Sequence, residues 1–125
     1  MRILIVDDDD DIRTVARMSL GRVGGHDVVA ASSGAEALAA LSDADGDAFD
    51  GVILDVQMPG MDGRSTLAAI REAGHTLPIV FLTAQVQRDE RSALEALDVS
   101  GVLSKPFDPM QLPADVAGVF GWPTT

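Results

Sequence analysis

The chain has 125 residues, and its 20 acidic and nine basic side chains give a formal net charge of −11 at pH 7. This length predicts one domain, large enough to bury most of its apolar surface without disulfides or structural metals. The charge disfavours direct binding of nucleic acid or of an anionic membrane, because both are themselves negative.

The sequence has no cysteine, so disulfides and thiolate metal sites are excluded. Met1 and Arg2 lead directly into an apolar run and five acidic residues, a pattern unlike a signal peptide. No apolar run approaches the roughly 20 residues that a membrane-spanning helix needs. These features predict a soluble protein of the cytoplasm.

Five short apolar runs predict the strands of a sheet. Runs that are continuously apolar, without alternation, are typical of parallel strands buried on both faces. The predicted strands are residues 3–6, 27–31, 52–54, 79–82 and 101–104.

Two predicted helices follow the first two strands. Apolar residues recur with helical spacing over residues 12–23, and Asp10 or Asp11 is available as the N-cap. Residues 33–36 match a capping box, in which a serine and a glutamate satisfy free backbone amides at a helix start. The second helix is therefore expected to begin near Gly34.

Three more helices are predicted, one after each of the remaining strands. Apolar positions within 67–73 mark the third helix, and the charged stretch 86–97 is expected to form the fourth. The last helix should begin or kink near Pro113, because a proline inside a helix removes a hydrogen bond. Residues 1–121 are thus the expected domain, and 122–125 a tail or the stump of a linker.

Strands that alternate with helices predict an α/β fold, a doubly wound five-stranded parallel sheet with right-handed crossovers. In such a sheet the carboxyl ends of all strands lie along one edge, where ligands bind at the switch point of the strand order. If strands one and three are neighbours there, Asp8 and Asp55 face each other. Four strands end on chemically capable residues: Asp7 with Asp8, Asp55, Thr83 and Lys105. The sequence therefore predicts a site at this edge.

The predicted site combines three carboxylates with a cation and a hydroxyl. Asp7, Asp8 and Asp55 cannot all stay ionised at close range without a counter-ion, and hard oxygen ligands favour Mg²⁺ or Mn²⁺. Mg²⁺ usually binds phosphate oxygens as well, so a phosphate ligand is implied. Lys105, the only lysine, and Thr83 suit a phosphoryl group in transfer, with Asp55 as the nucleophile.

These residues resemble a known family, the receiver domains of two-component response regulators. The resemblance covers residues 2–121, and four motifs carry it. They are Asp7-Asp8, the segment 55–63, Thr83-Ala84 and Lys105-Pro106-Phe107. It implies the flavodoxin-like strand order 2-1-3-4-5 and a cis peptide bond between Lys105 and Pro106.

The resemblance also implies a signalling phosphoacceptor that is not a turnover enzyme. Asp55 would receive a phosphoryl group from a phosphohistidine of a sensor histidine kinase or phosphotransfer protein, and Thr83 and Lys105 would contact that group. The face of the fourth helix, fifth strand and fifth helix would then switch and act on a downstream protein, a fused output domain or a second copy as a homodimer. The implied metal ligands are the carboxylates of Asp7, Asp8 and Asp55 and the main-chain carbonyl of Gln57.

The sequence departs from the family at three positions. Val102 stands where the fifth strand usually carries an aromatic switch residue, so signal output by the usual route is in doubt. Gln57 and Gln85 occupy positions that tune phosphoryl lifetime in the family, and amides neither donate nor accept protons readily.

Other interpretations fit less well. An aspartyl-phosphate phosphatase would need an acidic metal pair after the lysine, but only Asp108 and Asp115 follow, widely spaced. A second alternative is a receiver fold that serves only for docking and is never phosphorylated. The one observation against it is that all residues expected of a phosphorylation site are present. The acidic residues of 43–47 resemble the start of a calcium-binding loop. The glycine at its sixth position and the glutamate at its twelfth are absent, so a solvated loop is expected. Trp122 is expected to pack against the domain.

Overall fold

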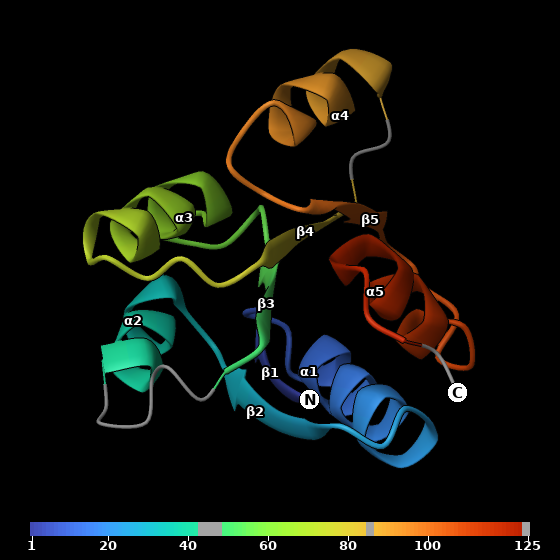
Figure 1. Ribbon diagram of the computed structural model, residues 1–125. Helices are drawn as coiled ribbons and strands as arrows, with labels where there is room; N and C mark the ends of the chain where they lie inside the picture. Colours follow the sequence, from blue (N-terminus) through green and yellow to red (C-terminus); the bar gives the residue numbers. More distant parts are fainter. Residues whose placement is uncertain (43–48, 85–86, 124–125) are drawn as a thin grey trace.

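The computed structural model describes residues 1–42, 49–84 and 87–123, so Gln85 and the loop 43–47 lie outside the described part. Five parallel strands form the central sheet in the order β2-β1-β3-β4-β5, with β1 between β2 and β3 at the switch point (Figure 1). The strands are β1 (Arg2–Val6), β2 (Asp27–Ala31), β3 (Gly51–Asp55), β4 (Ile79–Thr83) and β5 (Gly101–Ser104). The predicted fold and strand order are confirmed.

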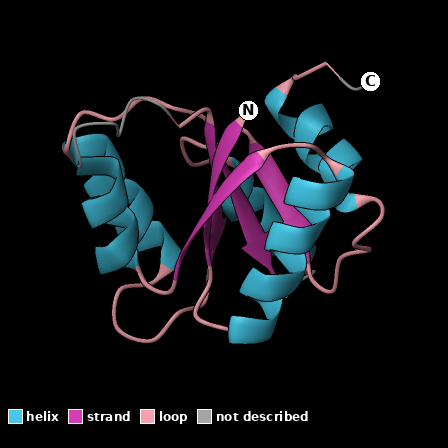
Figure 2. Cartoon of the chain, turned by 90° about the horizontal axis from the view of Figure 1, so that it is seen from below, coloured by secondary structure: helices cyan, strands magenta, loops and turns pink. Residues whose placement is uncertain are grey.

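Helices cover both faces of the sheet (Figure 2). They are α1 (Asp10–Met18), which continues into the π-helix η1 (Ser19–Val23), α2 (Gly34–Ser42), α3 (Gly63–Glu72), α4 (Arg88–Glu95) and α5 (Leu112–Phe120). Among the described residues, no helix is long and apolar enough to cross a bilayer.

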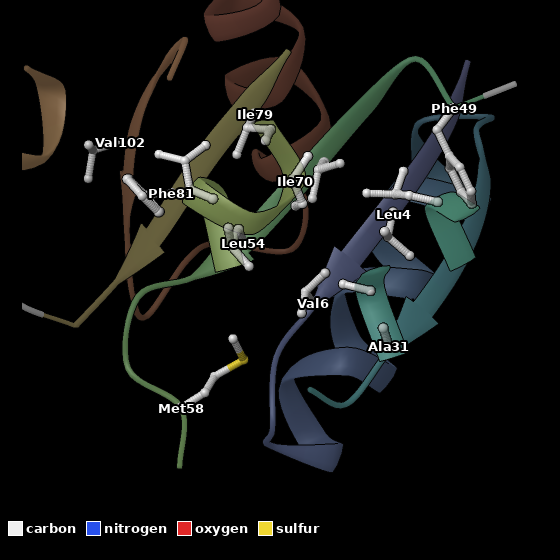
Figure 3. Packing of buried hydrophobic residues seen from close by; sticks show 14 of the residues in the cluster. Leu4, Val6, Ala31, Phe49, Leu54, Met58, Ile70, Ile79, Phe81 and Val102 are labelled. Carbon is white, nitrogen blue, oxygen red and sulfur yellow. The ribbon is translucent and has the colours of Figure 1, made fainter. Parts of the chain in front are cut away.

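Two hydrophobic cores lie on opposite faces of the sheet, because successive residues of a strand point to opposite sides. Leu4 and Val6 belong to the core with α2, α3 and α4, whereas Ile3 and Ile5 belong to the core with α1 and α5. Figure 3 shows part of the first core, where Phe81 of β4 packs among residues of the neighbouring strands. All residues of β3 and β4 are buried, as their continuous apolar runs predict.

The start of α1 differs from the prediction by one residue. Asp9 is the N-cap, and its carboxylate accepts hydrogen bonds from the backbone amides of Asp11 (2.8 Å) and Ile12 (3.4 Å). The prediction of Asp10 or Asp11 is wrong because the cap is the last residue with extended backbone, and all three aspartates have the side chain that a cap requires.

The predicted capping box of α2 forms only in part. The Ser33 hydroxyl accepts a hydrogen bond from the backbone amide of Glu36 at 3.1 Å, as predicted. The Glu36 carboxylate, however, accepts from the hydroxyl and the backbone amide of Ser32, one residue before the expected partner. α2 nevertheless begins at Gly34, where the sequence places it.

The last two helices were predicted with different success. α4 is shorter than the predicted 86–97, and Leu94 is its only buried side chain. α5 begins at Leu112, so Pro113 lies in the first turn, where its missing N–H leaves no hydrogen bond unmade. This start agrees with the prediction.

The last described residues, after α5, pack against the domain. Gly121, with a φ of 74°, terminates α5, and the backbone amide of Trp122 donates to the carbonyl of Ala117 at 2.8 Å. The Trp122 ring lies 4.7 Å from the Phe120 ring and 5.7 Å from the His26 ring, measured between centroids. The predicted packing of Trp122 on the domain is confirmed.

Candidate functional site

The chemically capable residues lie together at the carboxyl edge of the sheet. Asp7 follows β1, Asp55 ends β3, Thr83 ends β4 and Lys105 follows β5. Because β1 and β3 are neighbours, Asp7 and Asp55 meet at the switch point. Asp7, Asp55 and Thr83 are each at most 2% exposed, whereas Asp8 is exposed to solvent.

Three carboxylates form the centre of this site. Asp7, Asp8 and Asp55 each offer one oxygen, and these oxygens all lie within 4.8 Å of one another. Two of the three groups are buried and the third faces solvent, so a cation can approach from the side of Asp8. Hard oxygen donors at this spacing fit Mg²⁺ or Mn²⁺ and not a metal that prefers thiolates.

Lys105 lies against the two buried carboxylates. Its Nζ is 2.8 Å from Oδ2 of Asp7 and 3.3 Å from Oδ1 of Asp55. Burial disfavours the charge on the amine, yet the hydrogen bond to Asp7 and the charge of Asp55 raise the pKa of Lys105 above its ordinary value. Lys105 therefore stays a cation inside the site. The peptide bond between Lys105 and Pro106 is cis, as the resemblance implies.

The ionised form of Asp55 is disfavoured even with Lys105 beside it. Its burial, with the negative charge of Asp7 second, raises the pKa of Asp55 from 3.8 to about 6, although Lys105 acts in the opposite direction. The Lys105 ammonium thus does not offset the combined effect of burial and of the Asp7 charge on Asp55. A divalent cation would do so, which agrees with the donor set.

The turn after β3 fixes the surroundings of Asp55. The backbone amide of Gln57 donates to Oδ1 of Asp55 at 3.2 Å, and the amide of Gly63 donates to the carbonyl of Val56 at 2.9 Å. A Cβ on Gly63 would lie only 2.4 Å from the main-chain oxygen of Asp55, so this close approach requires glycine. An open hollow of about 630 Å³, lined in part by Gln57 and Glu90, borders the turn.

Thr83 and Lys105 are joined through the backbone. The amide of Lys105 donates to the carbonyl of Thr83 at 2.8 Å, and Thr83 pairs with Ser104 in the β4–β5 register. Asp55 pairs with Leu82 in the β3–β4 register, so the three predicted phosphoryl-site residues occupy adjacent strand ends.

An arginine that the sequence analysis does not single out connects α4 to β5. Arg91 donates from Nη2 to the carbonyl of Val102 at 2.9 Å and from Nη1 to the hydroxyl of Ser104 at 3.5 Å. The Val102 side chain is 3% exposed and packs in the core beside α4. Neither contact could be predicted from the sequence, because both depend on how α4 packs against the sheet.

The two histidines lie away from this site, and Asp108 and Asp115 do not join its carboxylates. His26 precedes β2 and His75 precedes β4, at the opposite edge of the sheet. Burial lowers the pKa of His26, which lies against Trp122. Asp108 is exposed and accepts a hydrogen bond from the amide of Met110 at 2.8 Å. Within residues 1–42, 49–84 and 87–123, the metal-binding group contains neither Asp108 nor Asp115, so the acidic pair of a phosphatase does not form there.

Comparison with known proteins agrees with this geometry. The family model of the response regulator receiver domain matches residues 3–117. The chain belongs to this family. The receiver domain is 40% identical over 107 residues to the response regulator MprA of Mycobacterium avium, covering 86% of this chain and 45% of MprA. It is 33% identical over 118 residues to the alkaline phosphatase synthesis transcriptional regulatory protein PhoP of Bacillus subtilis, covering 94% of this chain and 48% of PhoP.

Solved structures share the receiver fold. The chemotaxis response regulator CheY4 of Vibrio cholerae superimposes with a TM-score of 0.84 at 33% identity, covering 94% of this chain and 97% of CheY4. The response regulator TrrA of Thermotoga maritima, solved in complex with Mg²⁺-BeF, has a TM-score of 0.78 at 31% identity over the same shares of the two chains. This receiver domain spans about half the length of the curated relatives that it matches.

Proposed function

We propose that this receiver domain accepts a phosphoryl group on Asp55 from a phosphohistidine of a sensor histidine kinase or of a phosphotransfer protein. The observation that carries the proposal is the meeting of Asp7, Asp8 and Asp55 within 4.8 Å at the switch point, with the Lys105 amine against the two buried carboxylates. The proposed place of this reaction is the cytoplasm, and residues 1–121 are the proposed unit of function.

The proposed metal ligands are the carboxylates of Asp7, Asp8 and Asp55 and the main-chain carbonyl of Gln57. Bound Mg²⁺, or Mn²⁺, would supply positive charge to these carboxylates and to oxygens of the phosphoryl group. The raised pKa of Asp55 is consistent with this assignment, since burial and the charge of Asp7 disfavour its ionised form, which a cation would favour.

In the proposed transfer, a carboxylate oxygen of Asp55 attacks phosphorus while the bond from phosphorus to the imidazole nitrogen breaks. The bonding electrons return to the imidazole, and an acyl phosphate remains on Asp55. The Lys105 amine and the Thr83 hydroxyl donate hydrogen bonds to the phosphoryl oxygens as they take up charge. The domain promotes only its own phosphorylation and dephosphorylation, without turnover of a separate substrate.

The proposed output is a change of the face formed by α4, β5 and α5. Drawing the Thr83 hydroxyl toward the phosphoryl group moves the end of β4, which pairs with β5 at Ser104. The contacts of Arg91 with Val102 and Ser104 place α4 directly on this part of β5. A downstream protein, a fused output domain or a second copy of the domain would detect the altered face.

Intact-mass measurement after incubation with Mg²⁺ and acetyl phosphate tests the proposal. We expect one phosphoryl adduct that is stable in acid and lost in alkali, and none in Asp55→Asn or when EDTA replaces Mg²⁺. The same adduct in Asp55→Asn would move the nucleophile elsewhere, with Asp7 as the phosphatase-like alternative. No adduct on the wild type, with acetyl phosphate or with phosphorylated kinases, would favour a docking module that is never phosphorylated.

A further inference from the structure

A guanidinium group lies directly behind the acidic pair. Arg13, in the first turns of α1, donates from Nη1 to the main-chain oxygen of Asp7 at 2.7 Å. Its Nη2 donates to Oδ1 of Asp10 on the same helix. The Arg13 side chain is only 18% exposed, whereas that of Asp10 is 88% exposed, so the guanidinium spans from solvent to the backbone behind the site.

The oxygen that Arg13 contacts belongs to the peptide unit that joins Asp7 to Asp8. The other groups of Asp7 are also bound: its amide donates to the carbonyl of Ala31 at 3.1 Å and its Oδ1 accepts from the amide of Asp9 at 3.0 Å. Its Oδ2 lies 2.8 Å from the Lys105 amine. Arg13 therefore fixes the one remaining group of Asp7, and with it the plane of the peptide from which Asp8 departs.

We propose that Arg13 is a positioning residue for the metal site, which aims the exposed carboxylate of Asp8 by binding the main-chain oxygen of Asp7. This inference rests on the proposed function, since it concerns the same Mg²⁺ site. Asp8 is the ligand with most freedom, because it is exposed while Asp7 and Asp55 are fixed by burial and by Lys105. A backbone restraint on the preceding peptide therefore limits the directions from which its carboxylate can reach a cation.

The choice of arginine follows from the two contacts. A guanidinium presents several N–H groups in a rigid plane, so it can donate to a carbonyl and to a carboxylate at once, which a lysine ammonium on a flexible stem does less well. The carboxylate of Asp10 also offsets the charge of Arg13. The pair thus places a hydrogen-bond donor behind the site while adding little net positive charge that would repel Mg²⁺.

Positioning and simple electrostatics predict opposite results for Arg13→Gln. Loss of a positive charge near three carboxylates should by itself strengthen Mg²⁺ binding, whereas loss of the contact with Asp7 should weaken it. Partners of this indirect kind typically change metal affinity by about 10- to 100-fold. We expect isothermal titration with MgCl₂ to show a Kd for Arg13→Gln about tenfold above that of the wild type.

Arg17→Gln is the matched control, because it removes the same charge from an exposed position one turn further along α1. We expect its Mg²⁺ Kd to equal that of the wild type or to fall slightly. Arg13→Lys keeps the charge and should still bind Mg²⁺ several-fold more weakly than the wild type. A Kd for Arg13→Gln at or below that of Arg17→Gln, or a wild-type Kd for Arg13→Lys, would overturn the proposal.

Two further measurements keep the outcomes separate. Melting temperatures without metal show whether each variant is folded, and if Arg13→Gln does not fold, the Kd of Arg13→Lys alone decides. Asp8→Asn tests the metal site itself: if it binds Mg²⁺ as the wild type does, the proposed site is wrong whatever Arg13 does. If Asp8→Asn loses binding and the Arg13 variants do not weaken it, only the role of Arg13 is refuted.

Discussion

Replacing Asp55 by asparagine should stabilise the metal-free protein, because the charged carboxylate is unfavourable where it lies. Burial and the neighbouring Asp7 raise the pKa of Asp55 from 3.8 to about 6, even with Lys105 beside it. At about 1.4 kcal/mol per pKa unit, this rise corresponds to about 3 kcal/mol of folding free energy. Asparagine has nearly the shape of the protonated acid but does not ionise, so it avoids this unfavourable charge.

The pH dependence follows from the direction of the shift. A group with a raised pKa binds its proton more tightly in the folded state, so protonated Asp55 stabilises the fold fully below pH 3.8, and this stabilisation is lost as the pH rises through about 6. The advantage of Asp55→Asn over the wild type should therefore be greatest above pH 6, at about 3 kcal/mol, and shrink toward pH 3.8.

Urea unfolding with EDTA present measures this difference, with the fluorescence of Trp122, the only tryptophan, as the probe. Saturating Mg²⁺ should remove most of the difference, because the cation offsets the repulsion that the substitution relieves. A wild type that is the more stable protein above pH 6, or a difference that does not vary with pH, would refute the reasoning.

Three further predictions concern the metal site, the output and the turn after β3. Mg²⁺ at a hundred times its Kd should stabilise the wild type by about 2.7 kcal/mol, and calorimetry should show no such response in Asp8→Asn. Thr83→Ala should abolish the effect of phosphorylation on partner binding or dimerisation, whereas Val102→Ala should change it little, because valine is short and stiff at χ1. The ratio of affinities with and without phosphorylation measures both, and the reverse order would show that Val102 carries the signal. Gly63→Ala should lower the free energy of unfolding by about 1–3 kcal/mol, since its Cβ would lie 2.4 Å from the main-chain oxygen of Asp55. An unchanged urea midpoint would show that the turn relaxes around the methyl group.

The strands were predictable because burial on both faces leaves a simple pattern of continuous apolar runs, and their order followed from the resemblance to receiver domains. That pattern also places Asp55, Thr83 and Lys105 at strand ends, and parallel pairing brings strand ends to one edge. The roles of these residues remain predictions, since position alone does not establish chemistry. What the sequence determined most firmly is therefore the location of the site.

Details that depend on side-chain direction were not predictable. The run Asp9-Asp10-Asp11 offers equivalent caps, and only the backbone conformation selects the first. Arg13 reads as one more charged residue on a helix, and only the turn of the chain after β1 brings it to the oxygen of Asp7. The ends of α4 were misplaced because a helix with one buried side chain leaves little periodicity to detect.

The shallow attachment of α4 has a consequence for its dynamics. With Leu94 as its only buried side chain and Arg91 as a polar link to β5, this helix can detach with the loss of one side chain from the first core. Local opening of such an element requires much less free energy than global unfolding. Amide hydrogens of α4 should accordingly exchange with solvent faster than those of β3 and β4, and a modest energy released at the phosphoryl site would suffice to redistribute its conformations.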